Sequence, residues 1–189
     1  MFSAGGKSAV SQGYFVNNSL RFRASASAYL NRTPASAGNQ KTFTYSFWMK
    51  RGGLSTSQYQ MIFSTGSGGA NRDVIYFSNN NDSTLRYYTN AGGLGDDVLA
   101  TTQVFRDPSA WYHIVLAVDT TQATASNRFK LYVNGSQVTA FNINNSASIP
   151  QNTNMNTNSA IPHNISRDVV NAGLYFDGYL TDFYIIDGQ

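Results

Sequence analysis

The stretch SAWYHIVLAVDTTQATASNRFKLYVNGSQV, residues 109–138, decides the fold class of this chain. Its two apolar runs, Trp111–Val118 and Phe129–Val133, flank a polar connection, and the pair Asn134-Gly135 follows the second run at once. Asn-Gly between β-prone residues is the strongest short-range hairpin signal, because both central positions of a type I′ turn need a positive φ. The stretch therefore predicts an antiparallel meander that continues towards Phe141, which favours a sandwich or a barrel over a parallel α/β fold.

The composition fits one all-β domain. The chain has 189 residues, of which 41% are hydrophobic and 14% are aromatic, so it is long enough to build a sizeable core. Its 12 Tyr and 12 Phe suit pleated, half-buried surfaces, and no sustained 3.6-residue apolar repeat occurs, so we expect very little helix. The absence of cysteine excludes disulfides, thiolate nucleophiles and cysteine-based zinc sites.

The sequence divides into an arm and a domain. Residues 1–17 are small, polar and contain glycine, which predicts an N-terminal arm or linker ahead of one β domain over residues 18–189. Within the domain, residues 142–166 carry NINN, QNTNMNTN and two prolines, which predict a long Asn-rich loop. Outside the central meander, strands are expected at Ser19–Arg23, Ala28–Asn31, Thr42–Lys50, Gln60–Ser64, Asp73–Ser78, Thr84–Thr89 and Ala172–Asp187.

The charge pattern bears on the class of partner. The net charge is +3 and the pI is about 9.2, but the basic residues are dispersed and Lys50-Arg51 is their only adjacent pair. A nucleic-acid-binding protein concentrates its basic residues on one face, so we expect no nucleic-acid partner. The opening MFSAGGKSAVSQGYFV lacks an apolar run of signal-peptide length, and no later run is long enough to span a bilayer. We therefore expect synthesis in a cytoplasm and no membrane partner.

Three runs of the sequence are similar to one known family. SLRFRASASAYLNRTPASAGNQKTFTYSFWMKRG (19–52) resembles the opening of concanavalin A-like, laminin G-like domains of marine bacteriophage structural proteins. WYHIVLAVDTTQATASNRFKLYVNG (111–135) and FDGYLTDFYIIDGQ (176–189) resemble the central hairpin and the closing strand of that family. The resemblance covers residues 19–189. It implies an all-β jelly-roll sandwich of two curved antiparallel sheets.

The same resemblance implies a catalytic pattern that this sequence lacks. The glucanase members use two glutamates, one as nucleophile and one as acid/base, with an aspartate between them on one strand. This chain contains no glutamate, since all 10 acidic residues are aspartate. Its two histidines are interpreted as a packed strand residue, His113, and a loop residue, His163. Because glycoside hydrolysis needs two facing carboxyl groups, we expect that the protein is not an enzyme.

Glycan recognition needs an exposed aromatic side chain beside polar donors and acceptors. The candidate glycan-binding residues are Tyr59, Arg86, Tyr88, Asp96 and Asp97. Strand alternation places Tyr87 in the core and turns its two neighbours the other way, and cross-strand packing is the competing interpretation of these residues. Trp48 and Trp111 lie in mid-strand and are interpreted as core residues.

A calcium site is a further hypothesis for the glycine- and aspartate-bearing loop Asn90–Asp97. Lectin-like relatives bind calcium through Asp, Asn and backbone oxygens, which are hard ligands. The candidate ligands are Asn90, Asp96 and Asp97, with Asn81-Asp82 at a hairpin tip as the second cluster. Solvated turn residues explain the same pattern. We therefore assign no cofactor.

The resemblance favours a non-enzymatic bacteriophage virion protein that acts by docking to other virion proteins, as a capsid decoration, an appendage or a tail-associated component. Such a protein is made in the cytoplasm of the bacterial host, and residues 1–17 and 142–166 are the natural docking segments. The alternative is a lectin-like module that binds a host-surface glycan for receptor recognition, and a virion protein can combine both roles. A polysaccharide-degrading enzyme is the least favoured hypothesis. Both binding hypotheses are compatible with an oligomer.

Overall fold

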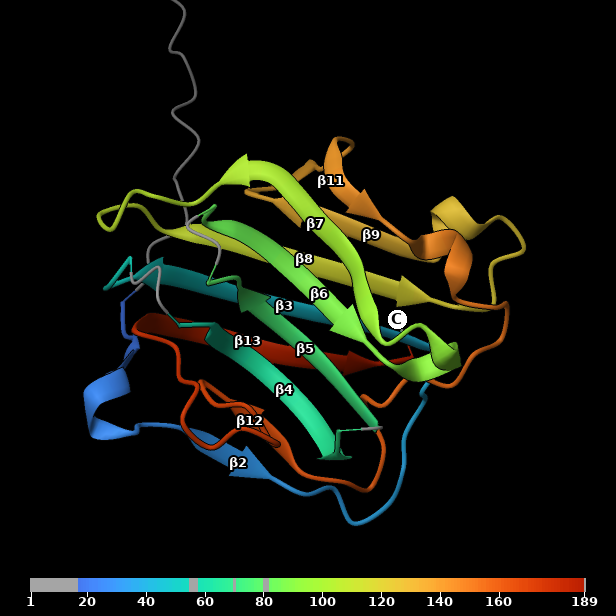
Figure 1. Ribbon diagram of the computed structural model, residues 1–189, viewed down its shortest axis with the longest axis horizontal. Helices are drawn as coiled ribbons and strands as arrows, with labels where there is room; N and C mark the ends of the chain where they lie inside the picture. Colours follow the sequence, from blue (N-terminus) through green and yellow to red (C-terminus); the bar gives the residue numbers. More distant parts are fainter. Residues whose placement is uncertain (1–16, 55–57, 70, 80–81, 189) are drawn as a thin grey trace, which may run out of the picture.

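The computed structural model describes residues 17–54, 58–69, 71–79 and 82–188, and it contains two antiparallel sheets packed face to face (Figure 1). The sheet that lies behind in Figure 1 has six strands, in the order β1 (Leu20–Phe22), β13 (Gly178–Asp187), β3 (Thr42–Arg51), β8 (Tyr112–Asp119), β9 (Phe129–Val133) and β10 (Ser136–Gln137). The sheet in front has seven, in the order β11 (Phe141–Asn144), β7 (Asp96–Val104), β6 (Thr84–Thr89), β5 (Asn71–Phe77), β4 (Gln60–Gly68), β12 (His163–Ile165) and β2 (Leu30–Arg32). This confirms the all-β sandwich.

Helical structure in the described residues is limited to four three-residue 3-10 turns, as expected. These are η1 (Ala24–Ala26), η2 (Ala91–Gly93), η3 (Ala125–Asn127) and η4 (Ser146–Ser148). Within the described part of the chain, no helix is long and apolar enough to cross a membrane. Of the arm predicted for residues 1–17, only the last residue is described, so the role of that arm stays a prediction.

Strand β3 shows why the sandwich forms. Its side chains alternate between buried and half-buried, and Phe43, Tyr45, Phe47 and Met49 are each 0% exposed between the sheets. A strand turns successive side chains to opposite faces, so an aromatic residue at every second position builds one apolar layer. Trp48 faces the other way and is half-buried on the outer face of the sheet, as is Trp111 just before β8. The interpretation of both tryptophans as core residues is therefore wrong, because both faces of this sheet carry aromatic side chains.

The predicted hairpins are confirmed. β8 pairs with β9 and β9 with β10, and the turn residues Asn134 and Gly135 have φ values of 51° and 79°. β5 pairs with β6 as the second hairpin. Beyond β10 the meander ends, because the chain crosses to the other sheet and β11 pairs with β7. The closing strand contains a bulge, seen as a register shift between Thr181 and Tyr184 of β13.

Strand β7 is a strand that the sequence analysis does not predict. Residues 97–101 are buried without alternation, because parts of both faces of β7 are covered. A period-2 pattern is the main signal of a half-buried strand, and it is absent here.

The Asn-rich segment 142–166 is more ordered than a long loop. It starts within β11, forms η4 and ends as β12, so only its middle is irregular. His163 is therefore not a loop residue, since it lies in β12 and is 9% exposed. The middle of the segment is held by Asp73 of β5, a fully buried carboxylate. Asp73 accepts hydrogen bonds from the Thr157 backbone N–H (2.7 Å) and hydroxyl (2.8 Å) and from the Asn156 amide (3.0 Å).

Candidate binding site

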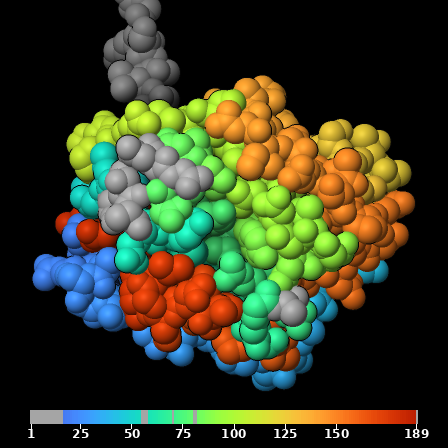
Figure 2. All heavy atoms as spheres, viewed as in Figure 1, coloured from blue at the N-terminus to red at the C-terminus, as the bar shows by residue number. Residues whose placement is uncertain are grey.

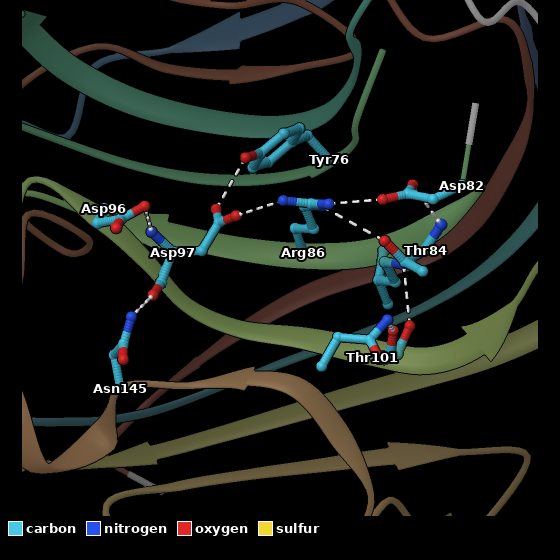
Figure 3. A network of polar contacts seen from close by, with 10 residues as sticks. Tyr76, Asp82, Thr84, Arg86, Asp96, Asp97, Thr101 and Asn145 are labelled. Carbon is cyan, nitrogen blue, oxygen red and sulfur yellow. Dashed lines mark hydrogen bonds and ion pairs between the residues drawn. The ribbon is translucent and has the colours of Figure 1, made fainter. Parts of the chain in front are cut away.

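Two of the predicted glycan-binding residues, Arg86 of β6 and Asp97 of β7, meet on the outer face of the seven-stranded sheet (Figure 3). The Arg86 guanidinium lies between two carboxylates, at 2.9 Å from Asp97 and 2.5 Å from Asp82. Its Nε also donates to the Thr84 hydroxyl at 3.3 Å. Tyr87 is in the core and Arg86 faces outward, which confirms the alternation. The donors of Arg86 are therefore directed at partners within the protein.

Asp97 of β7 is equally engaged. It is 3% exposed, one carboxylate oxygen accepts from the Tyr76 hydroxyl (2.7 Å) and the other from Arg86. Burial raises the pKa of the Asp97 carboxyl, and the hydrogen bonds from Tyr76 and Arg86 act against that rise. For Asp82, partial burial raises the pKa, but hydrogen bonds from the Thr84 backbone and from Arg86 outweigh it and lower the pKa overall. The network joins three neighbouring strands and the turn before β6.

The two tyrosines among the candidates differ in accessibility. Tyr59 is 37% exposed and its ring lies 5.7 Å from the ring of Tyr76. Tyr88 is half-buried, with the Arg72 guanidinium 4.9 Å from its ring centre. The segment around Leu174 lies over this face of the sheet, where Figure 2 shows it as a red-orange group of atoms. Of the five candidates, Tyr59 and Asp96 are exposed, and glycan binding by this face stays a prediction.

The candidate calcium ligands are engaged separately. Asn90 accepts from the Arg72 backbone N–H and donates to the Gly69 carbonyl, each at 2.6 Å. Asp96 accepts the backbone N–H of Asp97 at 2.7 Å. Asn81 lies outside the described residues. Among the residues that the structure describes, no group of three or more His or Asp side chains is placed to hold a metal ion.

A cleft of about 640 Å³ opens between β2 and β12 of one sheet and β13 of the other. Its apolar lining consists mainly of Leu30, Phe63, Ile165, Phe183 and Ile185. The ring of Phe183 stacks on Phe47 at 4.8 Å and on Phe63 at 5.9 Å, so the core supports it from below. The bulge in β13 permits this placement, because it resets the alternation just before Phe183. The size and the concave shape are those of a small-ligand site.

One side of the cleft is a fixed polar wall. The His163 ring donates from Nδ1 to the Ile161 carbonyl (2.7 Å), and its Nε2 accepts the Asn158 backbone N–H (3.2 Å). Burial lowers the pKa of His163, so the ring is neutral at pH 7. Asn158 then donates from its side chain to Asp187 at the end of β13 (3.2 Å). These contacts tie the irregular segment to both sheets.

The β2 side of the cleft, next to His163 of β12, carries polar groups that are free to meet a ligand. Arg32 and Ser36 line the cleft and are exposed, and their side chains make no hydrogen bond or ion pair within the described part of the chain. Asn31 also borders the cleft, but strand alternation turns its side chain to the other face of β2. Arg32 of β2 pairs in register with His163 of β12, so the two residues are neighbours in the same sheet. Sequence reasoning did not single out these residues, because the cleft is assembled from four distant segments and no local motif marks it.

Comparison with known structures gives related folds at low sequence identity. The SAP-like pentraxin of Limulus polyphemus has a TM-score of 0.50 and 14% identity, over 83% of this chain and 68% of that one. Domains LG4-5 of the mouse laminin alpha1 chain have a TM-score of 0.51 and 12% identity, over 83% of this chain and 38% of that one. The CBM40 of the Ruminococcus gnavus IT-sialidase, bound to alpha2,3 sialyllactose, has a TM-score of 0.51 and 15% identity, over 83% and 91%.

The sequence itself gives the firmer assignment. No curated protein matches it. A laminin G-type family model, however, matches residues 22–189, which include every strand of both sheets except the first two residues of β1. The protein therefore belongs to the concanavalin A-like lectin/glucanases superfamily.

Proposed function

We propose that this protein is a non-enzymatic adhesion module, carried on a bacteriophage particle, that binds a surface glycan in the cleft between β2, β12 and β13. The observation that carries the proposal is the pairing of an apolar floor with two unpaired polar side chains, Arg32 and Ser36. A sugar offers both apolar C–H faces and hydroxyl groups, so it needs both kinds of surface. The sialyllactose bound by the related CBM40 fold supports a glycan as the ligand class.

The arrangement of carboxylates supports a binding role over catalysis. Glycoside hydrolysis uses two carboxyl groups on either side of the scissile bond. Among the residues that the structure describes, Asp187 is the one carboxylate that lines the cleft, and the chain has no glutamate to supply another. On the outer face, Asp82 and Asp97 do lie near each other, but the Arg86 guanidinium bonds to both and fills the space between them.

A glycan array followed by calorimetry tests the binding role, with wild type compared with Arg32→Ala. A hydrogen bond to a charged group contributes about 1.5–3 kcal/mol, so we expect at least a roughly tenfold weaker affinity. Arg23→Ala is the matched control, because Arg23 is exposed, does not line the cleft and carries the same charge. It should leave the affinity unchanged. Absence of binding across a broad array, or equal losses in both variants, would contradict the proposal.

The outer-face candidates are the second arm of this experiment. Tyr59→Ala and Asp96→Ala remove the two exposed members and leave both ion pairs of Arg86 in place. If these variants lose glycan binding while Arg32→Ala keeps it, the site lies on the outer face of the seven-stranded sheet and the cleft assignment fails.

The phage part of the proposal is supported by the resemblance of the opening, central and closing runs to virion proteins. A cryo-EM map of a particle that carries this chain tests it. Density for the sandwich on the capsid or the tail is expected, with the cleft facing solvent. Particles that form without any such density would refute the virion role.

A further inference from the structure

The outer face of the six-stranded sheet carries a row of alternating cations and aromatic rings. We call Arg21, Tyr179, Lys50 and Trp111 the cation–aromatic row. Arg21 of β1 pairs in register with Tyr179 of β13, which pairs with Lys50 of β3, and Trp111 lies just before β8. The neighbours Leu180 and Met49 are buried between the sheets, so alternation directs the row outward.

The contacts within the row are close. The Lys50 ammonium lies 4.8 Å from the ring centre of Tyr179 and 5.6 Å from that of Trp111. The Arg21 guanidinium lies 4.8 Å from the Tyr179 ring. The two ring centres are 6.5 Å apart, with 60° between the ring planes. Cation–π contacts of this kind hold the rings and the ammonium in fixed places, so the row is preorganised.

The two cations of the row differ in whether an acidic partner compensates their charge. Arg21 is neutralised by Asp177 of the preceding loop at 3.0 Å. Lys50 has no acidic partner and no hydrogen bond within the described residues, so its three N–H donors are available. One uncompensated positive charge therefore sits between two aromatic rings.

We propose that the cation–aromatic row is a second carbohydrate site, which binds a polysaccharide of carboxylated sugars, that is, a polyuronate. The C–H faces of a pyranose pack on aromatic rings, and a carboxylate of the chain accepts from the Lys50 ammonium. The one uncompensated cation accommodates the carboxylate of a single sugar residue, and the two rings pack on the faces of that residue and its neighbours.

The row is separate from the cleft. It lies on the outer face of the six-stranded sheet, whereas the cleft lies between the sheets and draws on the inward residues Phe183 and Ile185 of β13. Binding at the cation–aromatic row therefore does not depend on glycan binding in the cleft.

Calorimetry of the full chain with oligogalacturonate tests the site through Lys50→Met. Methionine retains an apolar stem against the two rings and removes only the charge. We expect an affinity about tenfold weaker, and a similar loss for Trp111→Ala. Lys130→Met is the matched control, because Lys130 is half-buried on β9 of the same sheet and is not part of the row. Its affinity should stay within about twofold of wild type. Near-UV circular dichroism verifies that each variant is folded.

Three outcomes overturn the inference. In the first, Lys50→Met and Lys130→Met lose equal affinity, which marks unspecific electrostatic attraction. In the second, Arg32→Ala removes oligogalacturonate binding while Lys50→Met keeps it, which moves the acidic chain to the cleft. In the third, a sulfated polysaccharide or single-stranded DNA binds more tightly than oligogalacturonate and depends on Lys50.

Discussion

At the residue scale, Asp73 fixes a segment of chain that is distant in sequence. Its two carboxylate oxygens accept four hydrogen bonds, from the Thr89 hydroxyl (2.6 Å), the Asn156 amide and the N–H and hydroxyl of Thr157. Burial raises the pKa of Asp73, and these hydrogen bonds act against that rise. A raised folded-state pKa means that the stability from this group is present below the ordinary pKa and is lost as pH rises through the folded value. The structural role of the Asp73 carboxylate therefore lies in the four hydrogen bonds that it accepts.

The variant Asp73→Asn tests this account. The amide has one acceptor oxygen where the carboxylate has two, so its NH₂ group faces donors of Thr157 and leaves them unpaired in the interior. We expect a loss of about 1–3 kcal/mol in the free energy of unfolding, measured in urea. Asp96→Asn is the control, because its exposed side chain still accepts the Asp97 N–H, and it should change stability by less than about 0.5 kcal/mol. Equal effects of the two substitutions would contradict the role of Asp73.

His163 gives the fold a pH dependence of known sign. Burial lowers its pKa below the ordinary value of about 6.5, so the folded state holds a neutral ring where the unfolded chain takes up a proton. Stability from His163 is therefore present above pH of about 6.5 and is lost as pH falls through the folded value. Protonation would also turn Nε2, the acceptor for the Asn158 N–H, into a donor.

Urea unfolding of wild type and His163→Gln between about pH 7.5 and pH 5 measures the effect. As the pH falls, wild type should lose more unfolding free energy than His163→Gln, because histidine takes up a proton and glutamine does not titrate. Contributions of other groups, including Asp73, cancel in this difference. A difference that stays constant over the range would show that His163 is not held neutral.

At the element scale, the sequence predicts a strand correctly where only one face of that strand is buried. β3 places an apolar residue at every second position from Phe43 to Met49, and the turn before β10 carries Asn134-Gly135, so both can be predicted from the sequence. β7 is buried on both faces and leaves no period-2 signal. Strand alternation predicts correctly that Arg86 faces outward. Its ion pairs with Asp82 and Asp97 could not be predicted, because they depend on a turn and on a neighbouring strand. The cleft was not predictable, since crossovers between sheets bring its lining together.

Gly135 allows a test of one such turn. Its φ is 79° and a Cβ added there would meet no atom within 4 Å, so Gly135→Ala introduces backbone strain alone. We expect a loss of about 1–2 kcal/mol in thermal or urea unfolding. Gly173→Ala is the matched control, because it also has open space but no positive φ. It should be neutral or stabilise by up to about 1 kcal/mol, and a similar loss at both glycines would reject the strain argument.

At the scale of the whole molecule, the two proposed sites use the sandwich in different ways. The cleft exists because β2 and β12 of one sheet and β13 of the other leave a concave space between them. The cation–aromatic row exists because the six-stranded sheet carries aromatic rings on its outer face as well as in the core. A monomer with both sites presents two carbohydrate-binding surfaces without any second subunit.

The bulge in β13 has an evolutionary consequence. Tyr179 of the row precedes the register shift, whereas Phe183, Ile185 and Asp187 of the cleft lie at or beyond it. The shift separates the pairing of the two halves of the strand, so a substitution in one half does not force a compensating change in the other. Each of the two proposed sites therefore has its own half of the strand, so selection on one of them would act on residues that the other does not use.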